Sequence, residues 1–295
     1  MSSADVAVKV FRQLEPEDLK VLAAIELDFS SHRYVPAKDL PKLSSLDAKE
    51  IVHRLDRLNA FGLIYGHKGQ YVGYIMNMAG YDCLAINALV KGGVLEAFGK
   101  PLGVGKEADV YDALAPDGVR VAVKFHRLGR TSIRQTRRLR GYLADRGHIS
   151  WLYQSRLAAE REIEALRLVY PCGVSVPRPI SQNRHVVVMG IIEGAELSHF
   201  MEVSNPENVL DEILLNVRRC YLEARIVHGD LSEYNVILKP DWHILIIDWP
   251  QYVKADHPSA ETLLQRDLTN ILRFFERKFK TKRDLQKTLN YITMP

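Results

Sequence analysis

The spacing of apolar residues predicts a series of helices at the start of the chain. Between Glu15 and Phe29, apolar side chains recur every three to four positions, which is the period of a helix with one buried face. A short helix is expected near Pro36. A third helix is expected after Asp47, because the polar run that ends there is typical of a helix N-cap, and Phe61-Gly62 marks its end.

Two β-prone runs follow, at 63–65 and 71–74, on either side of a glycine-containing turn. They predict a hairpin. Three helices followed by a hairpin are the layout of a winged helix-turn-helix, which we assign to residues 1–80. A further helix over 81–98 is expected to connect this domain to the rest of the chain.

The predicted winged helix carries basic side chains that lie outside its predicted apolar core. Those off the apolar stripe of its third helix or at the hairpin tip are Lys49, His53, Arg54, Arg57, His67 and Lys68. A helix in a groove, with the wing on the backbone, is one way in which such domains bind nucleic acid. The same face could instead dock another protein, because winged helices serve both purposes and nearby acids dilute the positive charge.

After Gly99 the pattern becomes rich in strands. The expected elements are strands at 110–114 and 119–124 around a Pro-Asp-Gly turn, a long helix from Ser150, and a strand near 186–189. Helices dominate the remainder. We therefore expect an α+β protein in which a second domain spans 99–295, with lobes over about 99–189 and 193–295.

The segment 228–235 carries the strongest chemical signal. Asp230, an Asn five residues later and Asp248 after a short apolar strand are typical of enzymes that transfer a phosphoryl group. Such a transfer needs a carboxylate that accepts or orients the proton of the nucleophile, a role that we assign to Asp230. It also needs hard oxygen ligands for Mg²⁺, which Asn235 and Asp248 can supply.

Lys124 ends a predicted strand at the position where a kinase holds its phosphate-binding lysine. Such a lysine needs a carboxylate from the following helix, for which Glu160 and Glu162 compete. Glu160 shares its helix face with charged residues, whereas Glu162 is aligned with the small residues Ala158 and Ala165. A buried acid needs a partner that offsets its desolvation, so we predict an ion pair between Lys124 and Glu162.

A glycine-rich stretch before Lys124 is expected to hold the phosphates of a nucleotide. It comprises Gly103, Val104, Gly105, Lys106 and Glu107. It is not a Walker A loop, but backbone N–H groups and a lysine can approach a triphosphate there. The adenine is expected beside the stretch 189–194, with Met189 at the back of its pocket and Gly190 and Ile192 along its edge. The alternative for Met189 is an ordinary place in the core.

Composition narrows the class of protein. Of 295 residues, 47% are hydrophobic and 26% are charged, as in a folded domain. Three scattered cysteines argue against a disulfide framework or a zinc site and fit a reducing compartment. No secretory signal is visible, and apolar runs such as that at 244–247 are far too short to span a membrane. We therefore expect a cytoplasmic protein with no membrane partner.

The net charge of +4 is too small to indicate a polyanionic partner, but the charge is unevenly distributed. Between His126 and His148, seven arginines and one aspartate give a net charge of +6; the arginines are Arg127, Arg130, Arg134, Arg137, Arg138, Arg140 and Arg146. Arginine suits bidentate contact with phosphate, so we expect this segment to contact RNA; the alternative is a solvated loop without a partner. A second basic stretch could extend the same surface, with Arg273, Arg277, Lys278, Lys280, Lys282 and Arg283.

Together these motifs resemble the RIO family of atypical serine/threonine kinases. The segments that carry the resemblance are 103–107, 150–157, 228–235 and 247–251. The winged helix before them resembles the second RIO subfamily, and the absence of a long C-terminal tail resembles its archaeal members. Ordinary protein kinases carry Arg where Gly229 stands, and only 47 residues follow Asp248, which leaves no room for their peptide-binding subdomains.

The resemblance implies a truncated two-lobed kinase domain that uses ATP with Mg²⁺, for which Mn²⁺ could substitute. It implies a serine/threonine kinase or ATPase. Thr131, Ser132 and Thr136 follow the strand that enters the predicted active site, so we expect them to be sites of autophosphorylation. The resemblance also implies a role in maturing the small ribosomal subunit, with the precursor particle, its rRNA and assembly factors as partners. One departure is Ala108, where the family usually has Ser, and we expect weaker nucleotide binding from it.

Two other functions fit the same motifs. The segment 228–235, together with Ile-Asp-Trp at 247–249, also resembles aminoglycoside and choline kinases, although these need a large helical lobe after the metal-binding Asp. The third candidate is a non-catalytic RNA-binding scaffold that uses ATP as a structural ligand, against which the intact catalytic residues argue. Within an enzymatic role, Asp248 could itself accept a phosphoryl group during ATP hydrolysis.

Overall fold

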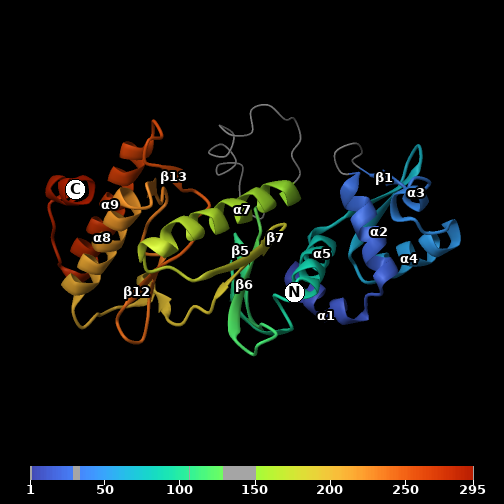
Figure 1. Cartoon of the computed structure of the whole chain (residues 1–295), viewed down its shortest axis with the longest axis horizontal. Helices are drawn as coiled ribbons and strands as arrows, with labels where there is room; N and C mark the ends of the chain where they lie inside the picture. Colours follow the sequence, from blue (N-terminus) through green and yellow to red (C-terminus); the bar gives the residue numbers. More distant parts are fainter. Residues whose placement is uncertain (1, 29–33, 106, 129–150, 295) are drawn as a thin grey trace. The chain divides into compact units, whose positions relative to one another are not determined.

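The computed structural model describes residues 2–28, 34–105, 107–128 and 151–294, and Figure 1 follows its elements along the chain. The chain divides into two compact units. The first contains residues 1–156 and 183–186, and the second contains 157–182 and 187–295. The division falls within the long helix α7 (Trp151–Val169).

The first unit begins with the helices and the hairpin of a winged helix. They are α1 (Ser3–Val10), η1 (Phe11–Gln13), α2 (Pro16–Leu27), β1 (Val35–Pro36), α3 (Leu40–Ser44), α4 (Ala48–Ala60), β2 (Ile64–Lys68), β3 (Val72–Met76) and α5 (Met78–Lys91). The strands form an antiparallel sheet in the order β1-β3-β2. Helix α4 begins where the Asp47 side chain accepts the N–H of Glu50 at 2.9 Å, which satisfies one of the free donors at the helix start.

The helix predicted from Glu15, the helix after Asp47 and the hairpin are confirmed. The short helix predicted near Pro36 is present but starts later, at Leu40, because Val35–Pro36 pair with β3 as strand β1. The connecting helix is shorter than predicted. Helix α5 ends at Lys91, where two glycines follow, and strand β4 already begins at Ala97.

The first unit continues into an antiparallel sheet of β4 (Ala97–Val104), β5 (Ala108–Leu114) and β6 (Arg120–His126). The pairing of β5 with β6 is regular, from Ala108 opposite His126 to Leu114 opposite Arg120. The pairing of β4 with β5 shifts register on both sides of Pro101, which has no N–H to donate to a ladder. The two strands predicted here are confirmed.

A cluster of buried charges joins α5 to this sheet. The Arg127 side chain is 1% exposed; its Nη1 and Nη2 donate to the two carboxylate oxygens of Asp82 at 2.8 and 2.9 Å, and its Nε donates to Asp109 at 2.9 Å. His185 Nε2 lies 2.5 Å from Asp82 Oδ1. Burial would raise the pKa of Asp82, but the Arg127 charge and the His185 hydrogen bond outweigh it, so its pKa lies below the ordinary value.

This cluster corrects one prediction about the arginine segment. Arg127 is not a solvated, RNA-facing residue, because two buried carboxylates hold its guanidinium. The other six arginines, like the candidate hydroxyls Thr131, Ser132 and Thr136, lie outside the described residues.

The second unit carries most of α7 and the remaining elements. They are η2 (Tyr170–Cys172), β7 (Pro179–Asn183), β8 (Val186–Gly190), β9 (Ala195–Glu196), η3 (Leu197–His199), α8 (Pro206–Leu222), β10 (Ile226–Val227), β11 (Val236–Leu238), β12 (Ile244–Ile246), β13 (Val253–Lys254), α9 (Ala260–Phe279) and α10 (Leu285–Thr293). Short antiparallel sheets form in the orders β12-β11-β9 and β10-β13.

Helix α9 supplies a large part of the core of the second unit. Its buried side chains Leu264, Leu268, Ile271 and Phe275 follow the helical period along one face. Among the described residues, none of the helices combines the length and the apolar character that a bilayer crossing requires.

Candidate functional site

The predicted catalytic loop joins β10 to β11 in the second unit. Its Asp230 side chain is 45% exposed, so an incoming hydroxyl can reach the carboxylate. His228, two residues earlier, is buried; its ring lies 4.5 Å from that of Trp249, and its Nε2 lies 3.0 Å from Ile247 O. These contacts attach the loop to the segment that carries Asp248.

Gly229 has a conformation that explains why no arginine stands at this position. Its φ is 77°, in the left-handed region that glycine adopts without strain. A Cβ atom here would lie 2.6 Å from Gln251 O, which is a backbone atom and cannot swing aside. The position therefore requires glycine.

Asn235 and Asp248, the two predicted metal ligands, lie on segments that hydrogen-bond to each other. Ile247 N–H donates to Asn235 O at 3.0 Å. Asn235 Nδ2 donates to Asp230 O at 2.8 Å, which commits the amide nitrogen and leaves the amide oxygen as the group for a cation. Asp248 follows β12 with a φ of 67°, an uncommon backbone state for a residue with a side chain and one that occurs often at functional sites.

Helix α9 holds the catalytic loop from behind through residues that the sequence analysis missed. The Asp267 carboxylate accepts the N–H of Gly229 at 2.8 Å and of Leu231 at 3.1 Å. Arg266 donates to Gly229 O and lies 3.8 Å from the Asp230 carboxylate. Asp267 is a buried acid within the apolar stripe of α9, the same signal that selected Glu162, and it could have been found in that way.

Burial raises the pKa of Asp267 to about 7, although the two loop N–H groups and Arg266 act in the opposite direction. The two N–H donors favour an ionised acceptor, so this carboxyl is balanced between its two protonation states near neutral pH. Asp267 is a positioning residue, because it acts on the backbone of the loop.

The predicted lysine and glutamate have the burial that the sequence analysis assigned to them. Lys124 is buried on β6, opposite Val110 of β5. Glu162 is 2% exposed on α7, whereas Glu160 on the neighbouring face is partly exposed, so the choice between the two by periodicity is confirmed as to burial. Lys124 and Glu162 belong to different compact units, and their ion pair stays a prediction.

The predicted phosphate loop comprises the end of β4, with Gly103 and Val104, and the turn that joins this strand to β5. A Cβ added at Gly103 would meet no atom within 4 Å, so this glycine is not required by packing and leaves space for a ligand. Gly105 N–H donates to Ala108 O at 2.9 Å, and Arg127 N–H donates to Glu107 O at 2.7 Å. Val104 is exposed at the tip, and Lys106 lies outside the described residues.

The segment predicted to border the adenine follows β8. Met189 is buried, and Gly190 N–H donates to Arg178 O at 2.8 Å, which removes that N–H as a donor to a base. Ile192 lies beyond the strand and is partly exposed. Recognition of an adenine edge would then rest on the groups after Gly190, and the roles of all three predicted residues stay predictions.

The described residues contain no group of three or more His, Cys, Asp and Glu side chains that could hold a metal ion. One amide oxygen and one carboxylate, from Asn235 and Asp248, fit instead the partial ligand set that Mg²⁺ takes when phosphate oxygens and water complete its shell. The residues present therefore fit Mg²⁺ bound together with a nucleotide.

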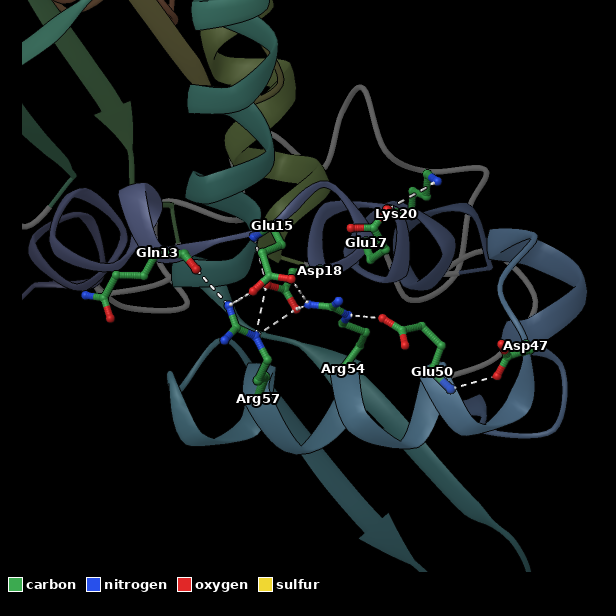
Figure 2. Close-up of polar contacts among 9 residues, drawn as sticks. All are labelled: Gln13, Glu15, Glu17, Asp18, Lys20, Asp47, Glu50, Arg54 and Arg57. Atoms are coloured by element: carbon green, nitrogen blue, oxygen red, sulfur yellow. Dashed lines mark hydrogen bonds and ion pairs between the residues drawn. The ribbon is translucent and has the colours of Figure 1, made fainter.

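The winged helix differs from the predicted nucleic-acid surface at two residues. Figure 2 shows Arg54 and Arg57 on α4 directed toward acids of the segment before and within α2. Arg54 is 8% exposed and donates to Glu15 at 2.7 Å and Glu50 at 2.6 Å, and Arg57 lies 3.1 Å from the buried Asp18. The expectation that Arg54 contacts nucleic acid is therefore wrong, because its side chain is buried against acids. Arg57 stays partly exposed, at 27%, but its guanidinium pairs with Asp18. The exposed basic residues of the surface are Lys49, His53, His67 and Lys68.

Comparison with known families gives two matches that together span most of the chain. Residues 109–288 match the RIO domain family, and residues 11–92 match the Rio2 N-terminal domain family. The chain is 45% identical over 271 residues to the RIO-type serine/threonine-protein kinase Rio2 of Methanocaldococcus jannaschii, which covers 89% of this chain and 98% of the relative. It is 35% identical over 271 residues to the serine/threonine-protein kinase rio2 of Dictyostelium discoideum, of which it spans only 52%.

Among solved structures, the chain is similar to the Rio2 kinase of Chaetomium thermophilum in an ADP/Mg²⁺-phosphoaspartate complex. The TM-score is 0.83 at 30% sequence identity, and the match covers 98% of this chain and 89% of the other. A second structure of the same kinase matches with a TM-score of 0.80 at 32% identity, over 95% of this chain and 88% of the other.

Proposed function

Because the chain belongs to the RIO family of atypical serine/threonine kinases and carries the Rio2 N-terminal domain, we propose that it uses Mg-ATP in the maturation of the small ribosomal subunit. The fold expected from the sequence, a winged helix followed by a truncated kinase-like domain, is confirmed. The observation that carries the proposal is the loop that holds an accessible Asp230 beside Asn235 and the Asp248 segment.

Asp230 accepts the proton of the attacking hydroxyl in the proposed reaction. The Asp267 carboxylate and the Asn235 amide fix the loop backbone on both sides of it, so its carboxylate is oriented before substrate arrives. Asn235 Oδ1 and the Asp248 carboxylate would hold Mg²⁺, which supplies charge neutralisation on the phosphates when bound. Lys124 would hold the phosphates, with Glu162 as its partner. The Chaetomium relative was solved with ADP and Mg²⁺, which supports these ligands; replacement by Mn²⁺ stays a prediction.

Asp248 supports a second route, in which the chain hydrolyses ATP. A carboxylate oxygen of Asp248 forms a bond to the γ-phosphorus while the bond from that phosphorus to the β–γ bridging oxygen breaks and ADP leaves. Water then hydrolyses the acyl phosphate, which releases phosphate and restores the carboxylate. The phosphoaspartate in the Chaetomium relative supports this route.

Two substitutions test the catalytic assignments. Asp230→Ala is expected to abolish autophosphorylation while ATP binding survives, and Asp248→Ala is expected to weaken Mg-ATP binding itself. Asp256→Ala, at an exposed acid outside the site, is the matched control. Turnover that survives in Asp230→Ala would remove this residue from its role. A radiolabel on the protein that hydroxylamine releases would support the acyl phosphate, and a label that only alkali releases would place the phosphate on Ser or Thr.

The ribosomal role rests on the resemblance of the chain, on its winged helix and on the arginine segment. On the winged helix the exposed residues Lys49, His53 and Lys68 remain for RNA contact, since the ring of the fourth exposed base, His67, stacks on that of Tyr34. Purified chain should sediment with precursor small-subunit particles in a non-hydrolysable ATP analogue and be released by ATP. The substitution of these three residues by Gln should weaken that association. If the chain associates with the particles under neither condition, the precursor particle is excluded as its partner. That result would favour a small-molecule phosphotransferase, for which aminoglycosides and choline are the substrates to assay.

A further inference from the structure

Helix α9 carries a basic face that runs along the catalytic loop. Arg266, Asn270, Arg273 and Arg277 recur at the spacing that places them on one side of a helix. At one end Arg266 lies 3.8 Å from the Asp230 carboxylate. Further along, Asn270 Nδ2 donates to Leu231 O at 3.2 Å and Arg277 lies near Glu233, so the face follows the loop from Asp230 toward its end.

The two outer arginines of this face are directed to solvent. Arg277 is 77% exposed and lies 3.7 Å from Glu233 of the loop, a contact too long and too exposed to neutralise it. Arg273 is exposed and makes no hydrogen bond or ion pair with another described residue. Beside Glu233, Tyr234 is 61% exposed. The surface next to the catalytic aspartate is therefore cationic with one large apolar side chain.

The other bases of the same stretch make contacts of their own. Lys278 Nζ donates to Met201 Sδ at 3.5 Å and Lys280 Nζ donates to Arg277 O at 3.2 Å, while Lys282 lies 3.4 Å from Glu276 and Arg283 lies 3.3 Å from Asp211. Of this stretch, Arg273 and Arg277 share the helix face of Arg266 and Asn270, which follows the catalytic loop. Two cations beside the loop are fewer than the about six to ten phosphate contacts of a nucleic-acid surface, so we treat this face as a peptide subsite.

We propose that the α9 face, formed by Arg273 and Arg277, binds acidic side chains of a protein substrate and makes the enzyme select Ser or Thr in an acidic context. The proposal rests on the proposed kinase activity. In the reaction the substrate oxygen forms a bond to the γ-phosphorus, its proton passes to Asp230, and ADP leaves with the electrons of the broken bond. Charge-assisted contacts between guanidinium and carboxylate favour the acidic chain at this step.

Helix geometry sets where the acids should lie. Arg273 is about 10 Å and Arg277 about 16 Å along the axis from Arg266, which adjoins Asp230, at 1.5 Å per residue. An extended peptide advances about 3.3 Å per residue, so the acids belong about three and about five positions from the phosphorylated residue. Side-chain reach broadens each position by about one residue.

Matched peptides test this selection. Serine peptides carry Glu, Gln or Lys at about three and about five positions from the acceptor, and the full chain phosphorylates them with Mg-ATP. Two sets are compared, one with these residues before the acceptor and one with them after it, because the peptide can run along α9 in either direction. In the set that matches the bound direction, the Glu peptide should have a kcat/KM about two- to fivefold above that of the Gln peptide for each acid, and the Lys peptide should fall below the Gln peptide. Equal rates for the Glu, Gln and Lys peptides in both sets would overturn the proposal.

Substitutions of the two arginines test whether the selection comes from this face or from the overall charge of the protein. Arg273→Gln and Arg277→Gln should each remove the advantage of one Glu position, and Arg273→Glu should invert it in favour of Lys. Lys282→Gln makes the same charge change away from the loop and should keep the Glu preference. An equal loss in Lys282→Gln would show a nonspecific charge effect and refute the assignment.

A binding measurement keeps the result independent of turnover. Fluorescence anisotropy with an acidic peptide that has Ala at the acceptor position, in the presence of ADP and Mg²⁺, should show tighter binding than its Gln counterpart, and Arg273→Glu should abolish the difference. If no peptide is phosphorylated but this difference is found, the kinase activity fails while the face stands. If the variants lower affinity for an RNA oligonucleotide and not for the peptide, the face binds nucleic acid and the proposal is wrong.

Discussion

Replacing Arg127 with Met is expected to destabilise the first unit far more than a surface substitution. The guanidinium donates twice to Asp82 and once to Asp109, at 2.8–2.9 Å, and both carboxylates are fully buried. Met fills a similar volume but removes the guanidinium that the two acids share. Breaking a buried pair by removing one partner costs about 3–5 kcal/mol, and two acids lose this partner at once. We therefore expect a loss of about 4–5 kcal/mol in the free energy of unfolding.

The loss should depend on pH with a definite sign. The pKa of Asp82 is lowered in the fold, where the Arg127 charge and the His185 contact outweigh burial. The stabilisation from an acid with a lowered pKa is present above its unfolded pKa of about 3.9 and is lost as pH falls through the lower folded value. The gap between the wild type and Arg127→Met should therefore be largest near neutral pH and shrink below about pH 4.

Urea unfolding followed by far-UV circular dichroism at several pH values measures both effects. Arg120→Met is the matched control on the same sheet, because Arg120 pairs with Asp112 at 3.0 Å on an exposed surface; its cost should stay below about 1 kcal/mol. If Arg127→Met accumulates unfolded, Arg127→Lys keeps the charge without the planar fork and should give an intermediate loss. A cost for Arg127→Met no larger than that of the control, or one independent of pH, would refute the reasoning.

Three further predictions follow from the loop and the winged helix. Gly229→Ala should lower the phosphorylation rate by about 10- to 100-fold, because a Cβ would meet Gln251 O at 2.6 Å and force the loop to shift; an unchanged rate would show that the loop adapts. Burial raises the pKa of Asp267 to about 7, so the carboxyl favours the fold fully below about pH 4 and loses this contribution as pH rises through 7. Thermal unfolding of Asp267→Asn should lack this pH dependence, and parallel curves would contradict the assignment. Arg54→Met should cost about 2 kcal/mol, because the buried Asp18 loses one of its two arginines, and should leave RNA affinity unchanged; a fall in affinity would restore Arg54 to the RNA surface.

The candidate site could be predicted largely because its signals are local. Asp230 and Asn235 lie on one loop, and a hydrogen bond across that loop joins the side chain of one to the backbone of the other. Glu162 could be chosen over Glu160 because burial on a helix follows a period of 3.6 residues, which the sequence displays directly. The support of the loop by α9 was missed, since Asp267 lies 38 positions from the Gly229 N–H that it accepts.

By itself the sequence determined the order of the elements, the family and the residue types that can transfer a phosphoryl group, because capping, periodicity and motif spacing are properties of neighbouring residues. It could not determine which cations are free to bind a partner. Arg54 and Arg127 look like solvated arginines in the sequence, yet they pair with Asp18 and Asp82, which lie 36 and 45 positions away. A charged side chain pairs inside the protein or stays available to a ligand according to which groups the fold brings within about 4 Å of it, and only the tertiary structure decides that.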